Sequence, residues 1–393
     1  WPRWRGPADS GSAAHGDCPV KWSSEDGFQW KTRLPGIGCS TPVVWDTHIL
    51  LTSTLDGRDL ALAYDWNGDL LWKKEIGAGI PGKHRNGSGS NPSIVTDGER
   101  VFAYFKSGNL AGLDLDGSIL WQTNLQDSYG KVQLYWDLGT SPALTKRDVV
   151  VAVMHGGDSY LAAFDQRTGK PSWKVSRNYK VPVECDHSYS TPLVINHDGV
   201  ETILVWGAEH LTAHDATDGS LLWSCGGFNP EQNRNWVQVS SFVVDGDIAV
   251  IPYGRGARLT GIRIGGTGDV SDKNRLWTKE NIGTFVPSPS LNDGKLFIVR
   301  DGGEIVCADA QTGETLWEDR FPKHRAKFYA SPTVAGDRLY VPREDGVVLV
   351  ADISDGFKLL AENDMGERLI ASPVPIGNRL LIRGEEHLYL IGK

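Results

Sequence analysis

Residues 165–173 read DQRTGKPSW, and variants of this phrase recur at DWNGDLLW (65–72), DLDGSILW (114–121), DATDGSLLW (215–223) and DAQTGETLW (309–317). Altered copies are EDGFQW (25–30), GGTGDVSDKNRLW (265–277) and DISDGFKLL (352–360), the last with Leu360 in place of Trp. Neighbouring copies end 40 to 54 residues apart. Self-similarity at such a period indicates a repeat architecture.

Each phrase has the same flanks. Alternating apolar runs such as VFAYFKS (101–107) and NLAGLDL (109–115) precede it across short turns, and upstream of them stands Ser/Thr-Pro, as in STPLV (190–194). Runs with period two, broken by Gly and Asp, predict hairpins of short strands. Each repeat therefore contains four antiparallel strands, A to D. Asp and Gly form the turn from C to D, and Trp wedges against the neighbouring sheet.

Eight such repeats predict an all-β, eight-bladed β-propeller of four-stranded antiparallel blades. The C-terminal stretch supplies strands A to C of the last blade, and GFQWKTRLP (27–35) supplies its strand D. Pairing these segments closes the ring and leaves no open edge. We expect residues 1–25 to form an N-terminal arm outside the ring and residues 26–393 to form a single propeller domain.

Composition narrows the classes of function. A net charge of −9 disfavours a nucleic-acid partner, and no apolar stretch approaches the ~18–20 residues of a membrane helix. Because the sequence begins with Trp1, we expect a removed leader and a periplasmic or extracellular location. In that compartment Cys18, Cys39, Cys185 and Cys225 are candidates for disulfides, with no pairing indicated, whereas Cys307 is expected to be a buried thiol.

The phrase from Ala163 to Trp173 resembles the tryptophan-docking repeat of propellers of the pyrroloquinoline-quinone (PQQ) type. That family contains calcium- and quinone-dependent alcohol dehydrogenases and non-enzymatic relatives such as the assembly factor BamB. The opening WPRWRGP (1–7) is similar to the start of secreted BamB-like proteins of planctomycete-type bacteria. The resemblance implies the fold; it does not by itself assign an activity, because one fold hosts many.

The sequence departs from the dehydrogenase pattern. It contains neither the adjacent Cys-Cys pair of those enzymes nor a C-x-x-C-H haem site. No motif with metal-ligand spacing is present. We therefore predict no cofactor and no metal site, and keep PQQ with calcium as a disfavoured alternative.

Function is expected in the irregular loops at one mouth of the central channel, where D-to-A connections meet B-to-C turns. The candidate ligand-binding residues of the D-to-A connections are His84, Arg85, Asn86, Tyr135, Trp136, Asp137, Asp186, Asn235, Trp236, Arg325, Tyr329 and Arg368. Trp136 and Trp236 are either loop anchors or aromatic platforms for a sugar or planar ring.

Three successive B-to-C turns carry Arg300, Arg343 and Arg383, and Lys106, His155, Arg255 and Arg258 occupy similar positions. If these side chains point inward, they form a locally basic funnel that attracts anions. The alternative is that each arginine pairs with a nearby acid, such as Asp301, Glu344, Glu385 or Glu386.

Two classes of function follow. The first is an exported, monomeric propeller that binds an anionic or polyhydroxylated small molecule, a glycan or an envelope protein at the funnel, with no assigned chemistry. The alternative is a polysaccharide lyase acting on uronate-containing glycans, in which His187 and Tyr189 transfer the proton and arginines offset the carboxylate. A PQQ-dependent dehydrogenase is a third, less favoured hypothesis.

Overall fold

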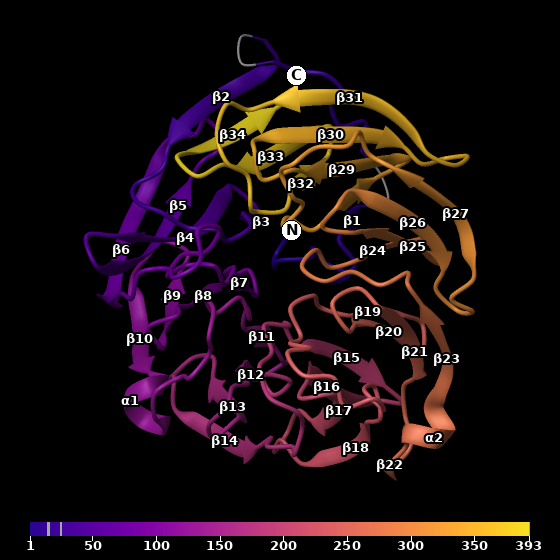
Figure 1. Cartoon of the computed structure of the whole chain (residues 1–393). Helices are drawn as coiled ribbons and strands as arrows, with labels where there is room; N and C mark the ends of the chain where they lie inside the picture. The colour runs from indigo at the N-terminus through magenta and orange to yellow at the C-terminus, as the bar shows by residue number, and fades with distance from the viewer. Residues whose placement is uncertain (14–15, 24–25, 393) are drawn as a thin grey trace.

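The computed structural model describes residues 1–13, 16–23 and 26–392. It is a closed ring of eight four-stranded antiparallel blades around a central axis (Figure 1). The predicted eight-bladed β-propeller is confirmed. The predicted boundary between arm and propeller falls at residue 25, outside the described residues, and stays a prediction.

Blades 1 to 4 follow in chain order, with strand A nearest the axis and strand D outermost. Blade 1 has β3 (Val43–Trp45), β4 (His48–Leu55), β5 (Arg58–Tyr64) and β6 (Leu70–Ala78). Blade 2 has β7 (Val95–Thr96), β8 (Arg100–Tyr104), β9 (Asn109–Asp114) and β10 (Ile119–Asn124), followed by helix α1 (Leu125–Tyr129). Blade 3 has β11 (Ala143–Leu144), β12 (Asp148–Val153), β13 (Tyr160–Asp165) and β14 (Pro171–Ser176). Blade 4 has β15 (Leu193–His197), β16 (Val200–Gly207), β17 (His210–Asp215) and β18 (Leu221–Cys225).

Blades 5 to 7 repeat the pattern with one insertion. Blade 5 has β19 (Val243–Asp245), β20 (Ile248–Tyr253), β21 (Arg258–Arg263) and β23 (Arg275–Glu280). Its stretched phrase forms β22 (Gly268–Asp269), which pairs with β18 of blade 4, and helix α2 (Ser271–Asn274). Blade 6 has β24 (Ser290–Asn292), β25 (Lys295–Val299), β26 (Glu304–Asp309) and β27 (Thr315–Arg320). Blade 7 has β28 (Thr333–Ala335), β29 (Arg338–Pro342), β30 (Val347–Asp352) and β31 (Lys358–Asp364).

Blade 8 closes the ring. It combines β32 (Val374–Ile376), β33 (Arg379–Arg383) and β34 (His387–Ile391) with β2 (Phe28–Arg33) as its outer strand. β2 pairs antiparallel with β34, with Trp30 opposite Leu390. The strand exchange expected from the sequence is therefore present.

The hydrophobic core is divided among the spaces between blades. Eight buried clusters each draw their strand residues from two neighbouring blades, for example Leu50 and Ala63 of blade 1 with Val101 and Leu113 of blade 2. Strands buried on both faces explain the continuous apolar runs in the middle strands. All five cysteines are free thiols, so none of the candidate disulfides forms.

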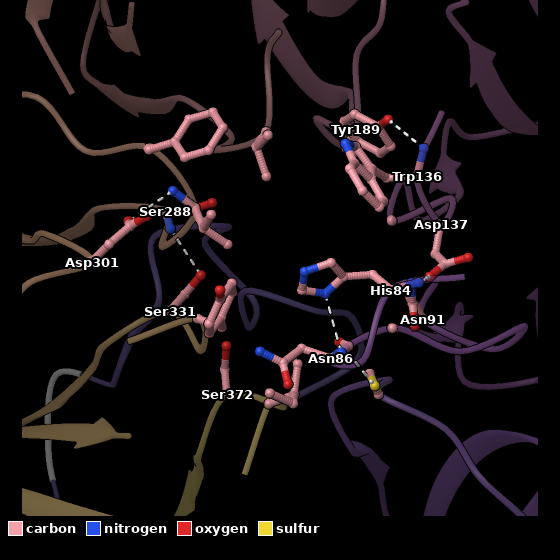
Figure 2. A pocket seen from close by; sticks show the side chains of 18 of the residues that line it. His84, Asn86, Asn91, Trp136, Asp137, Tyr189, Ser288, Asp301, Ser331 and Ser372 are labelled. Atoms are coloured by element: carbon pink, nitrogen blue, oxygen red, sulfur yellow. Dashed lines mark hydrogen bonds between the residues drawn. The ribbon is translucent and has the colours of Figure 1, made fainter. Parts of the chain in front are cut away.

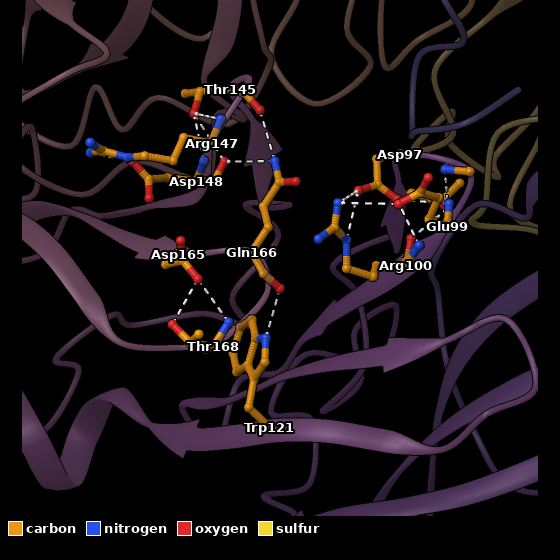
Figure 3. Close-up of polar contacts among 12 residues, drawn as sticks. Asp97, Glu99, Arg100, Trp121, Thr145, Arg147, Asp148, Asp165, Gln166 and Thr168 are labelled. Atoms are coloured by element: carbon orange, nitrogen blue, oxygen red, sulfur yellow. Dashed lines mark hydrogen bonds and ion pairs between the residues drawn. The ribbon is translucent and has the colours of Figure 1, made fainter.

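The repeated tryptophan locks each of five blades to the next. The indole Nε1 of Trp121 donates to the carbonyl oxygen of Gln166, 2.8 Å away in the turn of blade 3 (Figure 3). Equivalent bonds link Trp30 to Trp66, Trp72 to Leu115, Trp173 to Ala216 and Trp277 to Gln311.

The glycine of the phrase has two reasons to be glycine. Gly169 has a φ of +67°, a conformation that side chains disfavour. A Cβ at this residue would also stand 2.4 Å from the indole of Trp121. The aspartate completes the turn, since Oδ1 of Asp165 accepts from the backbone amide of Thr168 (Figure 3). The fixed offsets of the phrase are thus explained by turn formation and by docking of the preceding blade.

The N-terminal residues 1–13, called the arm below, reach the centre of the ring, where Figure 1 marks the N-terminus. Amides of blades 1 and 2 donate to the carbonyls of Trp1 and Pro2, and amides of blades 6 and 7 donate to those of Ser10 and Gly11. β1 (Ser12–Ala13) adds to β28 as a parallel strand. The arm therefore crosses the axis and touches blades on both sides of it.

Candidate functional site

A cavity of about 620 Å³ lies on the axis and is called the axial cavity below. Its wall is built from D-to-A connections, which supply His84, Trp136, Tyr189 and Tyr329, and from B-to-C turns. Figure 2 shows His84, Trp136 and Tyr189 on one side and Asp301, Ser288 and Ser331 on the other. The cavity therefore lies at the mouth that the loop lengths indicated.

One hydroxyl from each blade faces its neighbour at the bottom of this cavity. These residues, called the hydroxyl ring, are Thr41, Ser93, Ser141, Thr191, Ser241, Ser288, Ser331 and Ser372. Seven of the eight amides donate to the hydroxyl of the next blade, in consecutive bonds of 2.8–3.2 Å. The series begins with the amide of Ser372, which donates to Thr41, and ends with the amide of Ser288, which donates to Ser331. The ring couples all eight blades around the axis.

Six members of the hydroxyl ring line the axial cavity: Thr41, Ser93, Ser141, Ser288, Ser331 and Ser372. Within the described part of the chain, none of these hydroxyls donates to a protein acceptor. Five of these hydroxyl oxygens already accept a hydrogen bond from a backbone amide. Each of the five hydroxyls still has its proton available to donate to a ligand. The cavity floor therefore offers several hydrogen-bond donors to one bound molecule.

The side wall on blades 2 and 3 is aromatic. The ring centres of His84 and Trp136 are 5.4 Å apart in an edge-to-face arrangement. The ring of Tyr329, which comes from the connection between blades 6 and 7, lies 6.0 Å from that of His84, centre to centre. Trp136 remains 50% exposed, and its amide donates to the hydroxyl of Tyr189 at 3.2 Å. Aromatic faces beside hydrogen-bonding groups suit a ligand that carries both apolar and polar faces.

Asp137 fixes this wall. Its carboxylate accepts from the amides of Lys83 and His84 at 2.8–3.0 Å and lies 2.6 Å from the ammonium of Lys106. Asp137 is buried with all these partners in place. We conclude that it positions His84.

The opposite wall carries charge of both signs. The guanidinium of Arg255 stacks 4.1 Å from the ring centre of Phe285, and Lys327 lines the cavity with an exposed side chain. Burial raises the pKa of Asp301, although Lys327 and Arg255 oppose the shift. Glu184 also lines the cavity, so with Asp137 and Asp301 the lining contains three acids. The axial cavity is thus polar and mixed in charge.

Most arginines of the expected basic funnel bond to carboxylates or backbone carbonyls and do not face the axial cavity. Arg85 binds both carboxylate oxygens of Glu344 at 2.9 and 3.1 Å, and Arg343 binds Asp345 at 2.8 and 3.0 Å. A carboxylate therefore neutralises each of these two arginines, as the alternative interpretation expected. The partner of Arg343 is Asp345, whereas the sequence had suggested Glu344.

Four further arginines of the prediction lie outside the axial-cavity lining, whereas Arg255 belongs to it. Arg300 donates to backbone carbonyls of Asn281 and Gly256, and Arg368 donates to the carbonyl of Arg85. Arg383 is buried against the carbonyls of Ser40 and Thr52. Arg325 is exposed to solvent.

The hypothetical catalytic pair is split. Tyr189 lines the cavity, whereas His187 lies beyond the lining, 4% exposed, with its ring 5.0 Å from that of Tyr135. The Nε2 of His187 is 3.7 Å from Asp186, and burial lowers the pKa of His187. Burial also raises the pKa of Tyr189, which favours the neutral phenol.

The second loop tryptophan acts as an anchor. Trp236 packs edge to face on Tyr253 at 5.4 Å, with Arg258 over its ring at 5.5 Å. Its neighbour Asn235 adopts a φ of +63° and accepts from Arg255 through its carbonyl. Of the predicted ligand-binding residues, those in the cavity lining are His84, Asn86, Trp136, Asp137 and Tyr329, and Tyr189 of the hypothetical catalytic pair joins them.

Sequence reasoning missed the hydroxyl ring and Trp4. Six of the eight ring residues, all except Ser93 and Ser241, are the serine or threonine of the Ser/Thr-Pro signal, which served only to locate strand A. A polar residue once per blade beside the axis was itself informative. Trp4 of the arm lines the axial cavity. The arm carries no repeat, so no periodic signal placed it there.

The chain matches two curated relatives over only part of their length. The chain is 26% identical over 204 residues to the outer membrane protein assembly factor BamB of Burkholderia pseudomallei, covering 50% of this chain and 48% of that protein. It is 45% identical over 47 residues to a tetrathionate hydrolase of Acidianus ambivalens, covering 12% of this chain and 9% of that protein. The matches thus span less than half the length of either relative.

Solved structures share the fold. A europium-containing methanol dehydrogenase superposes with a TM-score of 0.73 at 12% identity, covering 98% of this chain and 96% of that one. BamB from Moraxella catarrhalis superposes with a TM-score of 0.63 at 15% identity, covering 93% and 98%. At these identities the likeness shows the architecture alone.

The resemblance to quinone-dependent dehydrogenases implies a metal ion, and the described residues supply no ligand cluster for one. Among residues 1–13, 16–23 and 26–392, no group of three or more His, Cys, Asp or Glu side chains could hold a metal ion. Asp137 in the cavity wall is already committed to Lys106 and two amides. We therefore derive no step through a quinone.

The sequence profile of one family matches residues 14–189 and 266–369, which is more than two thirds of the chain. The matched part contains the complete Asp–Gly–Trp phrases of blades 1, 2, 3 and 6, and the ring that they build is present. The chain therefore belongs to the family of the outer membrane protein assembly factor BamB.

Proposed function

We propose that this protein is an exported propeller that binds a polyhydroxylated or anionic ligand in the axial cavity, without chemistry of its own. The observation that carries the proposal is the hydroxyl ring. Ser93, Ser141 and Ser331 accept amide bonds from neighbouring blades and keep their protons for a ligand. A ligand rich in acceptor oxygens matches such a floor.

The wall supports a glycan more than a small inorganic anion. Trp136 is half exposed beside His84 and Tyr329, and a sugar ring has an apolar face for such a surface and hydroxyls for the floor. A volume of about 620 Å³ suits a small oligosaccharide rather than a single ion. The pairing of Arg85 and Arg343 with acids leaves Arg255 and Lys327 as the cavity cations.

An export location and an envelope partner belong to the same proposal. The related protein is named an assembly factor for outer membrane proteins, and a propeller mouth offers a docking surface for another protein. Within the described residues no helix is long and apolar enough to cross a membrane.

The proposal is tested by calorimetry against a panel of neutral and uronate-containing oligosaccharides. Trp136→Ala should abolish or weaken binding at least tenfold, because it removes the exposed ring from the cavity wall. Tyr135→Ala is the matched control: the side chain is 58% exposed and does not line the cavity, so it should bind like the unaltered protein. Equal binding by both variants, or no binding across the panel, would refute a glycan cavity.

The same panel separates binding from the lyase alternative. Lyase action on uronate chains creates an unsaturated sugar that absorbs in the near ultraviolet. We expect bound uronate oligosaccharides to be recovered intact, because His187 and the paired arginines do not face the axial cavity. A growing absorbance that depends on Tyr189 would favour the lyase.

A further inference from the structure

The axial cavity ends at the hydroxyl ring. In six blades the lining residue furthest along the connection into strand A is the member of the hydroxyl ring, which stands two residues before that strand. Among the described residues, none that belongs to an A strand or to an A-to-B turn lines the cavity. The cavity therefore does not continue along the axis to the opposite face of the propeller.

The arm lies directly beneath the hydroxyl ring. Its backbone carbonyls accept hydrogen bonds from the amides of Val44, Thr96, Leu291 and Val334 at 2.8–3.0 Å. Each of these four residues follows the ring member of its own blade by three positions, which is about 10 Å further from the mouth in an extended chain. Because the four contacts come from blades 1, 2, 6 and 7, the arm spans the channel under the ring.

The arm is firmly held and leaves little free space beside it. Arg5 is 4% exposed and donates to the carbonyls of Pro289 and Pro332 at 2.7 and 3.0 Å and to the hydroxyl of Ser290 at 3.0 Å. Towards blades 3 to 5, the space between the arm and the A strands is a cavity of about 20 Å³, which has room for one water molecule. A sugar unit does not fit through such a gap, so a ligand enters the axial cavity from the loop mouth.

Trp4 is the arm residue at this closed end. Among residues 1–13 it alone lines the axial cavity, where it joins the members of the hydroxyl ring, and it remains partly exposed. Its backbone is fixed from both sides, because its carbonyl accepts from the indole of Trp1 at 3.3 Å and the next residue is the anchored Arg5. An aromatic residue beside hydroxyl donors suits a sugar ring, which has an apolar face and a polar edge.

We propose that the axial cavity recognises the end of a glycan chain and that the terminal sugar unit stacks on Trp4. This inference rests on the glycan binding proposed above and adds which part of the glycan enters. A cavity with one mouth admits a chain end, whereas an internal segment needs a second opening or a sharp bend. The apolar face of the terminal sugar contacts the indole of Trp4, and its hydroxyls bind the hydroxyl ring.

Calorimetry on the unaltered protein tests recognition of a chain end. The probes are linear glucose oligosaccharides and oligogalacturonates, each as a short and as a long chain of the same repeat. Because the two ends of a sugar chain differ chemically, one protein should bind per chain at every length. If the number of bound proteins grows with chain length, the cavity binds internal segments, and end recognition is wrong although glycan binding stands. If no probe binds, glycan binding fails and end recognition fails with it.

Variants test the role of Trp4 separately. Trp4→Ala should weaken binding about tenfold, and Trp4→Phe, which keeps an aromatic face, should restore most of the affinity. Trp45→Ala is the matched control, because Trp45 is 39% exposed at the end of β3 and does not line the axial cavity; it should bind like the unaltered protein. Binding that is lost in Trp136→Ala but unchanged in Trp4→Ala would overturn the role of Trp4 and leave the glycan cavity in place.

A crystal of the unaltered protein gives a measurement that does not depend on folding of a variant. After soaking with the short chain that binds, the terminal sugar should lie within about 4 Å of the indole of Trp4. A chain that lies across the mouth, with no sugar unit beside Trp4, contradicts the proposal.

Discussion

Trp121 shows how one side chain carries both packing and a hydrogen bond. Its indole fills the space beside Gly169 of the next blade and donates to the carbonyl of Gln166 at 2.8 Å. Trp121→Ala leaves a cavity and an unpaired carbonyl, so the free energy of unfolding should fall by about 3–5 kcal/mol. Leu120→Ala, one residue earlier and 47% exposed, should change it by less than about 0.5 kcal/mol. Denaturant unfolding measures both, and equal losses would refute the docking role.

His214 makes the stability depend on pH. It is buried, its ring nitrogens lie 3.0 Å from the carbonyl of Gly219 and the hydroxyl of Thr212, and desolvation lowers its pKa to about 4. The unfolded chain takes up this proton below about pH 6.5, whereas the folded chain resists it until about pH 4. The free energy of unfolding therefore falls as the pH drops through this window, by about 2 kcal/mol between pH 7 and pH 5 from this residue.

Urea unfolding at a series of pH values checks that sign. His214→Gln has no proton to gain, so the stability of the variant should depend less steeply on pH between 6.5 and 4 than that of the unaltered protein. Identical slopes would show that His214 does not contribute.

At the scale of the elements, the hydroxyl ring joins neighbouring A strands through single atoms. The hydroxyl of Ser141 accepts from the buried amide of Ser93 at 2.9 Å. Ser141→Ala leaves that amide without an acceptor and should lower the free energy of unfolding by about 1–3 kcal/mol. Ser141→Thr keeps the hydroxyl, as Thr41 and Thr191 do naturally, and should restore most of the loss in denaturant titrations. Failure of Thr to restore stability would mean that the size of the side chain, and not its hydroxyl, decides the effect.

The strands could be predicted because each follows from a local sequence pattern. The partners of the charged side chains in the loops could not be predicted. Alternation located the middle strands of the blades, and the Ser/Thr-Pro signal marked strand A in six of the eight, all except blades 2 and 5. Arg85 finds its acid in Glu344, five blades further along the chain, and no spacing in the sequence indicates that meeting. The same holds for the arm, since Arg5 donates to the carbonyls of Pro289 and Pro332 at 2.7 and 3.0 Å across the axis.

The candidate site was therefore predicted in place but only partly in composition. Loop length located the mouth, and Trp136 and His84 line the axial cavity. The converging hydroxyls come from the most regular part of the repeat, where repetition itself suggested a purely structural role. A residue repeated once per blade beside an axis converges eightfold, so repetition near the centre of a ring assembles a site as well as a fold.

At the scale of the whole molecule, blade 8 is special. Among the four core strands of each blade, β34 and β2 are the one pair of neighbours that come from opposite ends of the described chain. Arg33 faces His387 there, three residues after the docking Trp30. Arg320 faces Glu304 at the equivalent place of blade 6, three residues after Trp317. A disulfide at the first pair closes a loop of nearly the whole chain, and one at the second closes a single hairpin.

Because loop-closure entropy grows with loop length, the double variant Arg33→Cys/His387→Cys should gain roughly 6 kcal/mol on oxidation, against about 3 kcal/mol for Glu304→Cys/Arg320→Cys. Guanidinium unfolding with and without reductant measures both gains on the same chains. The geometry of the two pairs is matched, so strain in the new bond affects both alike and the difference reports the closure. If the two oxidised variants gained equally, the entropy of closing the longer loop would not contribute to the stability gained by joining β2 to β34.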